Sequence, residues 1–403
     1  MEQMISNIDE FAPIIISALV SLFCTCWIQP HILKVAKVKN IVDNPSARKL
    51  QRVPIPVLGG LTVVFGVLSG VMCLNLFGNI QGLFPVFAVI IIIMIIGLID
   101  DIISLSPKVR FIAEILLITY LIYTTGYHIN NFHGLWGIFE IPSYISVPLT
   151  VFASVGIVNA INLIDGVDGY SSGYSIVSCI IFGVMCYTLG NIQMVALAGI
   201  LIASLLPFFL HNVFGLKSKM FIGDAGTLSL GIIFSVFVIT ILSTPTESNA
   251  IISPNLGLIP FTLAVLCIPV ADTLRVMSAR VIKRKSPFSP DKTHLHHLFI
   301  ELGFNHICTT ISIIIINLFI VLCWFAAYKC GISIELQLYL VIALGVVVTF
   351  IFYPFMKVQI RNNTKIYRGL NKIAQLTHIK HEGFWAFTQK VADWQIKDEV
   401  SES

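Results

Sequence analysis

The sequence predicts an all-α, polytopic integral membrane protein with about 11 transmembrane helices. Of its 403 residues, 56% are hydrophobic and only 11% are charged, whereas a soluble domain carries roughly 25% charged residues. Apolar runs of about 18 residues recur along the chain, which is the length that spans a bilayer as a helix. These runs lack the alternation of apolar and polar residues found in membrane barrels, so helices are favoured.

Each predicted span is an apolar run bounded by polar or charged residues. The runs are Phe11–Ile28, Leu58–Phe77, Leu83–Ile99, Val109–Tyr123, Pro148–Asn162, Gly173–Leu189, Met194–Leu210, Ser229–Leu242, Leu258–Leu274, Thr309–Ala327 and Leu336–Tyr353. The first run follows acidic residues and lacks a small-residue cleavage site, so we expect a retained helix and not a cleaved signal peptide.

The distribution of basic residues predicts the orientation. With the N-terminus outside and the C-terminus cytoplasmic, 24 of the 25 Lys and Arg residues fall in inner loops or in the tail, and only Lys329 falls outside. Cytoplasmic loops of membrane proteins hold an excess of these residues. The net charge of +4 therefore reflects loop asymmetry and does not indicate a nucleic-acid partner.

Two regions are expected along the chain. Residues 1–354 form a transmembrane catalytic domain, and residues 355–403 form a cytoplasmic tail. The tail places apolar residues such as Ile366, Leu370 and Ile373 at helical spacing. This spacing predicts amphipathic helices that lie on the inner leaflet, with packing against the protein as the alternative. The longest outer loop, residues 124–147, contains Asn and Gly residues suited to a hairpin.

Acidic residues gather at the predicted cytoplasmic ends of the helices. They are Asp100, Asp101, Asp165, Asp168, Asp224 and Asp272. One Asp at a helix end is often a boundary residue, but six on one face, beside Gly and Asn residues, favour a functional site. Asn162 precedes Asp165 by three residues and shares its face if the helix persists. Converging carboxylates need a metal, a proton or a basic partner, and Asp and Asn oxygens suit Mg²⁺.

Basic and histidine residues follow the ninth span. Arg280 precedes a His-x-His-His cluster at residues 294–297. A zinc site would need a fourth ligand and a wider spacing, so an anion clamp for a diphosphate is favoured. The stiff loop Pro54–Gly60 follows Lys49 and Arg52 in the sequence, and together they predict a basic rim for the site. The chain has no Gly-x-x-x-x-Gly-Lys-Ser/Thr loop for ATP. Acids on one side and basic groups on the other are typical of phosphoryl-transfer sites.

In these motifs the chain resembles the polyprenyl-phosphate N-acetylhexosamine-1-phosphate transferases of glycosyltransferase family 4, over nearly its whole length. The matching segments, in family order, are the Pro-x-Pro-x-x-Gly-Gly loop, Asp100-Asp101, Asn159–Gly169, Phe221–Gly226 and His294–His297. The His-x-His-His form is closest to bacterial undecaprenyl-phosphate GlcNAc-1-phosphate transferases. The peptidoglycan branch of the family, phospho-MurNAc-pentapeptide translocase, has three consecutive histidines.

The resemblance implies a reaction and a location. Undecaprenyl phosphate attacks the β-phosphorus of a UDP-N-acetylhexosamine, foremost UDP-GlcNAc. The products are a lipid-diphosphate sugar and UMP, in the initiating step of cell-surface polysaccharide synthesis. The protein is expected in the bacterial cytoplasmic (inner) membrane, with its active site facing the cytoplasm and a homodimer as its assembly.

The resemblance also implies roles for individual residues. Asn162 and Asp224 hold Mg²⁺, or Mn²⁺ in its place. Asp100 deprotonates or orients the lipid phosphate, with Asp101 close by. Three further residues are expected to be catalytic: Asp165 and Asp168 on the metal and nucleotide side, and His294 on phosphate. The others bind the substrates: His296, His297 and Arg280 on phosphate; Phe221 on uracil; Asn212 on the nucleotide; and Lys49, Arg52 and Asn159 on substrate.

Two alternatives stay open at this point. One is phospho-MurNAc-pentapeptide translocase, which differs in the donor sugar. The other is a cation-coupled transporter, a class in which acids lie near the bilayer midplane and the sequence contains repeats. Here the acids cluster at one face and no repeat is visible, so the transporter is disfavoured.

Overall fold

A computed structural model describes residues 2–45, 51, 53–78, 80–243, 255–287, 292–377 and 383–394. The α-helices are α1 Glu2–Val38, α2 Gly59–Asn75, α3 Phe84–Ile103, α4 Pro107–Thr125, α5 Ser143–Leu163, α6 Tyr170–Thr188, α7 Ile192–Phe214, α8 Gly223–Leu242, α9 Leu258–Val265, α10 Cys267–Ile282, α11 Leu295–Glu301, α12 His306–Lys329, α13 Ile334–Val346, α14 Tyr353–Arg361, α15 Lys365–Leu376 and α16 Phe384–Asp393. Short 3₁₀ turns, η1 Gln81–Leu83 and η2 Leu135–Gly137, and a π-helical segment, η4 Val347–Phe352, complete the helical elements.

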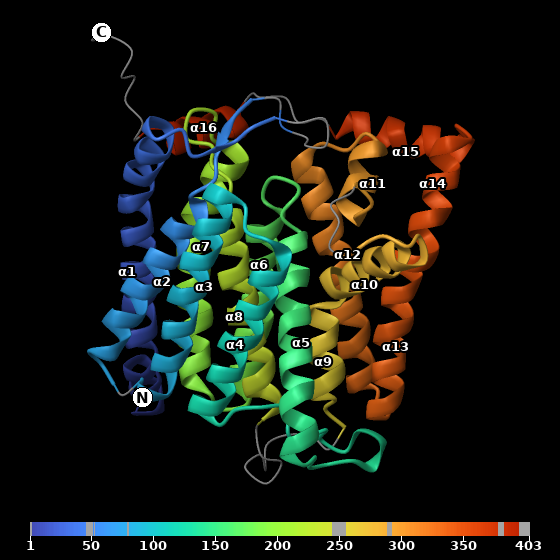
Figure 1. Cartoon of the computed structure of the whole chain (residues 1–403). Helices are drawn as coiled ribbons and strands as arrows, with labels where there is room; N and C mark the ends of the chain where they lie inside the picture. Colours follow the sequence, from blue (N-terminus) through green and yellow to red (C-terminus); the bar gives the residue numbers. More distant parts are fainter. Residues whose placement is uncertain are drawn as a thin grey trace.

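The prediction of an all-α membrane protein is confirmed. Within the described residues, eight helices are long and apolar enough to cross a bilayer, or nine if the bent pair α9 and α10 is one span. Two further helices lie at predicted spans: α2 is only 17 residues long, and α4 carries Lys108, Arg110 and Glu114 near its start. The count of eleven crossings therefore stays a prediction. Figure 1 shows the N-terminus at one end of the bundle and α15 and α16 at the other.

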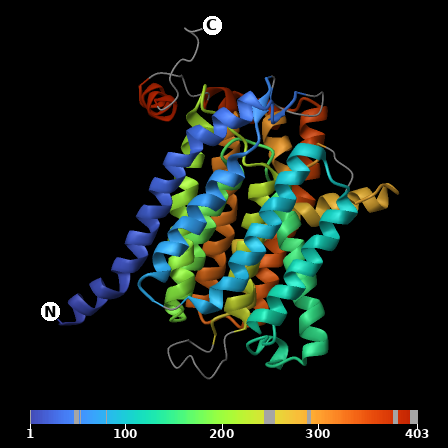
Figure 2. The same ribbon diagram turned by 60° about the vertical axis from the view of Figure 1, so that its left-hand side comes forward.

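The helix α8 forms the centre of the bundle. Every residue from Ala225 to Leu242 is buried, and α8 packs against α2, α3 and α5. The outer helices expose large apolar side chains such as Phe23, Leu116, Phe152 and Phe319. Exposed apolar surface of this extent is stable when lipid tails cover it. The core of the molecule is thus around α8, and the two views in Figures 1 and 2 show the other helices around it.

Glycines allow α8 to approach its neighbours closely. A Cβ atom on Gly60 would lie 2.1 Å from the backbone nitrogen of Gly226, and a Cβ on Gly97 would lie 2.5 Å from the backbone nitrogen of Ala225. Small residues at helix contacts let two backbones pack directly against each other. The first turn of α8 is therefore fixed between α2 and α3.

We expect Gly97→Ala to destabilise the protein because the added methyl group meets backbone atoms, which cannot move as a side chain can. Overpacking of this kind lowers the free energy of unfolding by about 1–3 kcal/mol. The measurement is the thermal unfolding midpoint of the purified protein in detergent. The control is Gly156→Ala on α5, where a Cβ would meet nothing within 4 Å. Equal midpoints for the two variants would contradict the close packing of α3 on α8.

The ninth predicted span is broken, and this corrects one expectation. The helices α9 and α10 meet at an angle of 73°, and α10 runs across the bundle in Figures 1 and 2. Asp272 was expected at the end of this span, but it lies inside α10, which continues to Ile282. The predicted boundary between the membrane domain and the tail, after residue 354, falls inside a continuous helical span. That span starts at Ile334 and continues to Arg361. The division into two regions stays a prediction.

Two of the described connections contain paired backbone. The strands β1 Val42–Asp43 and β2 Ile55–Pro56 pair antiparallel, with Val42 opposite Pro56. The loop of residues 124–147 forms the expected hairpin, because Asn131 and Glu140 form an antiparallel bridge. In the tail, α15 contacts the preceding helices through Asn371, which donates to the Leu302 carbonyl at 2.9 Å. Part of the tail therefore packs against the protein, and the contact of the tail with the inner leaflet stays a prediction.

Candidate active site

The end of α3 meets the start of α8. The backbone N–H groups of Asp224 and Ala225 donate to the Asp101 carboxylate at 2.9 and 3.1 Å. The first N–H groups of a helix have no partner within the helix, and a carboxylate stabilises them. Asp101 thus caps α8 from a neighbouring helix and positions Asp224. The part that Asp101 was expected to take in catalysis stays a prediction.

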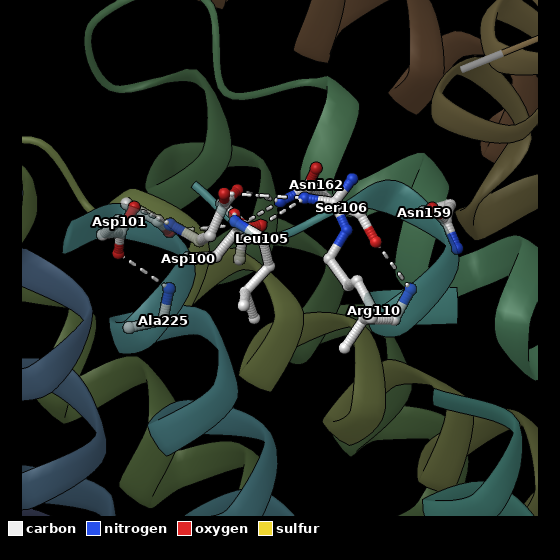
Figure 3. Close-up of polar contacts among 12 residues, drawn as sticks. Asp100, Asp101, Leu105, Ser106, Arg110, Asn159, Asn162 and Ala225 are labelled. Atoms are coloured by element: carbon white, nitrogen blue, oxygen red, sulfur yellow. Dashed lines mark hydrogen bonds and ion pairs between the residues drawn. The ribbon is translucent and has the colours of Figure 1, made fainter. Parts of the chain in front are cut away.

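Asp100 and Asp224 share one cationic partner, Arg110. The Arg110 guanidinium lies 2.9 Å from Asp100 and 3.5 Å from Asp224, and Asp100 also accepts the backbone N–H of Leu105 at 2.6 Å. Figure 3 shows Asp100, Arg110 and Asn162 gathered where α3, α4 and α5 converge. Two carboxylates this close to one cation repel each other when that cation is removed. The predicted acidic centre therefore forms, with a basic residue that the sequence analysis did not select.

Asn162 completes this centre from the end of α5. Its Nδ2 donates to the Asp224 carboxylate at 2.6 Å and to the Thr227 hydroxyl at 2.8 Å. The Asp224 side chain remains 32% exposed, so a ligand can reach it. The two residues predicted to hold a metal are thus brought into contact.

Asn159, one turn earlier on α5, has a structural partner. Its Nδ2 donates to the buried Glu114 carboxylate at 2.6 Å and to the Val155 carbonyl at 2.9 Å. Glu114 also lies 3.9 Å from Arg110, one turn away on α4. Asn159 was expected to bind substrate. Its contacts fix α4, and with it Arg110, against α5, and its binding of substrate stays a prediction. The i,i+4 spacing of Arg110 and Glu114 was the available sequence signal.

Asp168 forms a second polar group beside the acidic centre. Its carboxylate accepts from Lys219 at 2.6 Å and lies 2.7 Å from Nδ1 of His306. Burial opposes ionisation of Asp168, but the hydrogen bond from His306 and the charge of Lys219 outweigh it and lower its pKa below the ordinary value. Asp168 is therefore ionised at neutral pH. The sequence analysis did not select Lys219 or His306.

Asn212 and Asp165 support the same loop. Asn212 is buried; its Oδ1 accepts from the Gly169 backbone at 2.6 Å, and its Nδ2 donates to the Met220 carbonyl at 2.9 Å. Both ends of this amide have partners within the protein, so Asn212 holds the two loops together, and its hydrogen bond to the nucleotide stays a prediction. Asp165 is exposed and accepts from the Ser171 hydroxyl at 2.7 Å.

His294 pairs with Asp272. Its Nδ1 lies 2.9 Å from the Asp272 carboxylate, which also accepts from Arg275 at 2.6 Å. The Arg275 guanidinium in turn donates to the Thr293 carbonyl. A carboxylate bound to one ring nitrogen fixes the orientation of the imidazole and leaves the other nitrogen for a ligand. The break before α10 thus places Asp272 where it can orient His294.

The other members of the predicted clamp behave differently. His296 is buried, and burial lowers its pKa well below the usual value, with His297 and His294 adding to the effect. Its imidazole is therefore held in the neutral form, which can still donate a ring N–H, and its contact with phosphate stays a prediction. Its ring packs on Gly166, where a Cβ would lie 2.2 Å from Nε2. The His297 ring lies 4.2 Å from the His296 ring.

Arg280 contacts the turn that follows α10. It is buried and donates to the Pro287 carbonyl at 2.5 Å. Arg280 was expected to bind phosphate together with the histidines, and this stays a prediction. The arginine that lies beside His294 is Arg275, through their shared partner Asp272.

The Pro-x-Pro-x-x-Gly-Gly loop supports the start of α8. The backbone N–H of Phe221 donates to the Pro56 carbonyl at 2.8 Å, and the Phe221 carbonyl accepts from Gly59 at 2.9 Å. Phe221 is half-buried, and its stacking on uracil stays a prediction. Lys49 and Arg52, the predicted basic rim, lie outside the described residues.

The structure therefore brings together most of the predicted site. Asp100, Asp101, Asn162 and Asp224 form one connected centre, and the loop that follows Asn162 carries Asp168 and contacts His296 through Gly166. His294 belongs to a separate pair with Asp272. These features define a class: a polytopic membrane protein with a carboxylate-lined polar site at the ends of its helices.

Comparison with known proteins identifies the family. The chain belongs to glycosyl transferase family 4, whose sequence profile matches residues 83–242, and it is therefore a transferase. A Bacillus subtilis (strain 168) protein named "Probable undecaprenyl-phosphate N-acetylglucosaminyl 1-phosphate transferase" is 30% identical over 311 residues, 77% of this chain and 83% of that protein. Two proteins named undecaprenyl-phosphate alpha-N-acetylglucosaminyl 1-phosphate transferase also match. The Yersinia pestis protein is 31% identical (68% of this chain, 73% of that protein), and the Escherichia coli (strain K12) protein is 30% identical (68% and 72%).

Proposed function

We propose that the protein transfers GlcNAc-1-phosphate from UDP-GlcNAc to undecaprenyl phosphate and releases UMP, in the step that initiates synthesis of a cell-surface polysaccharide. The names of its relatives support the lipid acceptor and the transferred group. The single observation that carries the proposal is the centre formed by Asp100, Arg110, Asn162 and Asp224. Phosphoryl transfer depends on positioning and on charge stabilisation, and this centre offers both.

The residues present fit a magnesium ion that is held jointly by the protein and by the phosphates of the substrate. Within the described part of the chain, no three His, Cys, Asp or Glu side chains converge to form a closed metal cage. Mg²⁺ is usually held by one or two carboxylates together with substrate phosphates and waters. Asp224, which is partly exposed and in contact with Asn162, matches this mode. These two residues would hold the ion, which would neutralise charge on the diphosphate.

The other residues take roles that follow from their contacts. Asp100 orients the lipid phosphate, and Arg110, which lies between Asp100 and Asp224, limits the repulsion between acids and phosphates. His294, oriented by Asp272, presents its second ring nitrogen to a phosphate oxygen. Asp168 with Lys219 and His306 forms the nucleotide side. We favour direct attack by the lipid phosphate, because positioning suffices for this reaction.

The topology belongs to the same proposal. We infer eleven crossings, with α2 and α4 as spans, the N-terminus outside and the acidic centre at the cytoplasmic face of the bacterial inner membrane. The excess of Lys and Arg in the loops at that end supports this orientation. There the lipid acceptor from the inner leaflet and a nucleotide sugar from the cytosol can meet. A homodimer is part of the proposal on the family resemblance alone.

The test uses the purified full-length protein in detergent with UDP-GlcNAc, undecaprenyl phosphate and Mg²⁺. We expect UMP release that requires all three components and stops when EDTA removes the metal. Replacing the donor with UDP-MurNAc-pentapeptide should give no product, and a preference for that donor would favour the peptidoglycan enzyme. Solute uptake into proteoliposomes without UMP release would favour a transporter and overturn the proposal.

A further inference from the structure

The last helix of the tail docks on the end of α7. The Phe214 ring lies 4.7 Å from the Trp385 ring and 6.4 Å from the Phe384 ring. Aromatic pairs at these distances attract each other beyond the effect of the area they bury. The helix α16 is therefore held against the segment that follows α7, residues 215–220.

One carboxylate at the end of α16 binds that segment. Asp393 accepts the backbone N–H groups of Leu216, Lys217 and Ser218 at 3.2, 3.2 and 2.9 Å, and the Ser218 hydroxyl at 2.7 Å. Burial raises the pKa of Asp393, but these hydrogen bonds outweigh it and lower the pKa below its ordinary value. Successive backbone N–H groups that point at one carboxylate form an anion-binding nest. The backbone of residues 216–218 is thus shaped around Asp393.

The same segment ends at the candidate active site. Lys219, the next residue, donates to Asp168 at 2.6 Å, and the Met220 carbonyl accepts from Asn212 at 2.9 Å. Lys37 of α1 donates to the Lys217 carbonyl at 2.8 Å. Ser218, which contacts Asp393 of the tail, and Lys219, which pairs with Asp168, are therefore adjacent residues.

We propose that α16 acts as a latch in which Asp393 fixes the backbone of residues 216–218 and so holds Lys219 against Asp168. Asp393 is then a positioning residue that acts through Lys219. The part of the proposal that concerns activity rests on the proposed function, because Asp168 is assigned to the nucleotide side of that site.

The first test measures the latch without any assay of activity. In the full-length protein, Asp393→Ala should raise the hydrogen-exchange rate of the backbone amides of residues 216–218 about tenfold or more, because charge-assisted hydrogen bonds are lost. The matched control is Lys390→Ala, an exposed position on the same helix, which should leave these rates unchanged. If Asp393→Ala does not fold, Asp393→Asn, which keeps the shape of the side chain, replaces it. Unchanged exchange in the Asp393 variant would overturn the latch.

The second test asks whether Asp393 acts through Lys219. Asp393→Ala and Lys219→Met should each raise the KM for UDP-GlcNAc about tenfold with a smaller change in kcat, since each loosens one charge-assisted contact. The double variant should be no worse than Lys219→Met alone, because interacting residues are not additive. Effects of the two changes that multiply would show independent action and overturn this route. A wild-type protein without UMP release would count against the proposed function, while the exchange measurement would still decide on the latch.

Discussion

Asp224→Asn should abolish UMP release while the protein remains folded. The change removes the negative charge beside Asn162 and Arg110, on the residue proposed to hold magnesium against the diphosphate. We expect turnover to fall by at least about 10³-fold, which is the scale of losing one preorganised electrostatic contact in an active site. The amide keeps the size of the side chain, so the thermal unfolding midpoint should change little. Both quantities can be measured on the same detergent-purified sample.

The matched control for this change is Glu335→Gln. Glu335 lies at the start of α13, where it accepts the backbone N–H of Trp136 at 3.1 Å, at the end of the bundle away from the acidic centre. It loses one charge in the same acid-to-amide exchange and should retain full turnover. Normal UMP release by Asp224→Asn would remove Asp224 from the proposed metal site.

Arg110→Met should have the second-largest effect. It leaves Asp100 and Asp224 without the cation that they share, and it leaves the buried Glu114 with only its hydrogen bond from Asn159. Breaking a buried ion pair in this way destabilises a protein by about 3–5 kcal/mol. Turnover should fall about a hundredfold or more because the acids lose their arrangement. Arg110→Lys should recover only part of the activity, since an ammonium group cannot bridge several carboxylates as the guanidinium does.

Lys108 provides the control for Arg110. It lies two residues earlier at the exposed start of α4, so Lys108→Met removes the same charge without touching the acidic centre. UMP release and the unfolding midpoint of this variant should match the wild type. If Lys108→Met and Arg110→Met lost activity equally, net charge at this face would explain the loss, and the specific role of Arg110 would be wrong.

Much of the fold and the acidic centre could be predicted from the sequence. Long apolar runs determine helices, and Asp or Asn residues at their ends stand out in a chain with few charges. Asp100, Asn162 and Asp224 were selected in this way, and they meet in the structure. The bend before α10 could not be predicted, because the apolar run from Leu258 to Leu274 continues through it.

Sequence reasoning missed the residue pairs that form between distant segments of the chain. Lys219 and His306 meet at Asp168 across 51 and 138 residues of chain, and neither stands in a motif. Asp101 and Asn212 were given roles by the family resemblance, and their contacts within the protein were not foreseen. Their partners are backbone N–H and carbonyl groups, which every residue carries, so a sequence cannot reveal such pairing.

The burial of α8 from Ala225 to Leu242 has a consequence for how the enzyme responds to its membrane. A helix that touches lipid adjusts its tilt when the hydrocarbon thickness changes. Along its apolar length α8 is enclosed by other helices, and its first turn is fixed by Asp101 and by glycine contacts with α2 and α3. The depth of Asp224 is therefore set by protein packing, which shields the chemistry from changes in acyl-chain length.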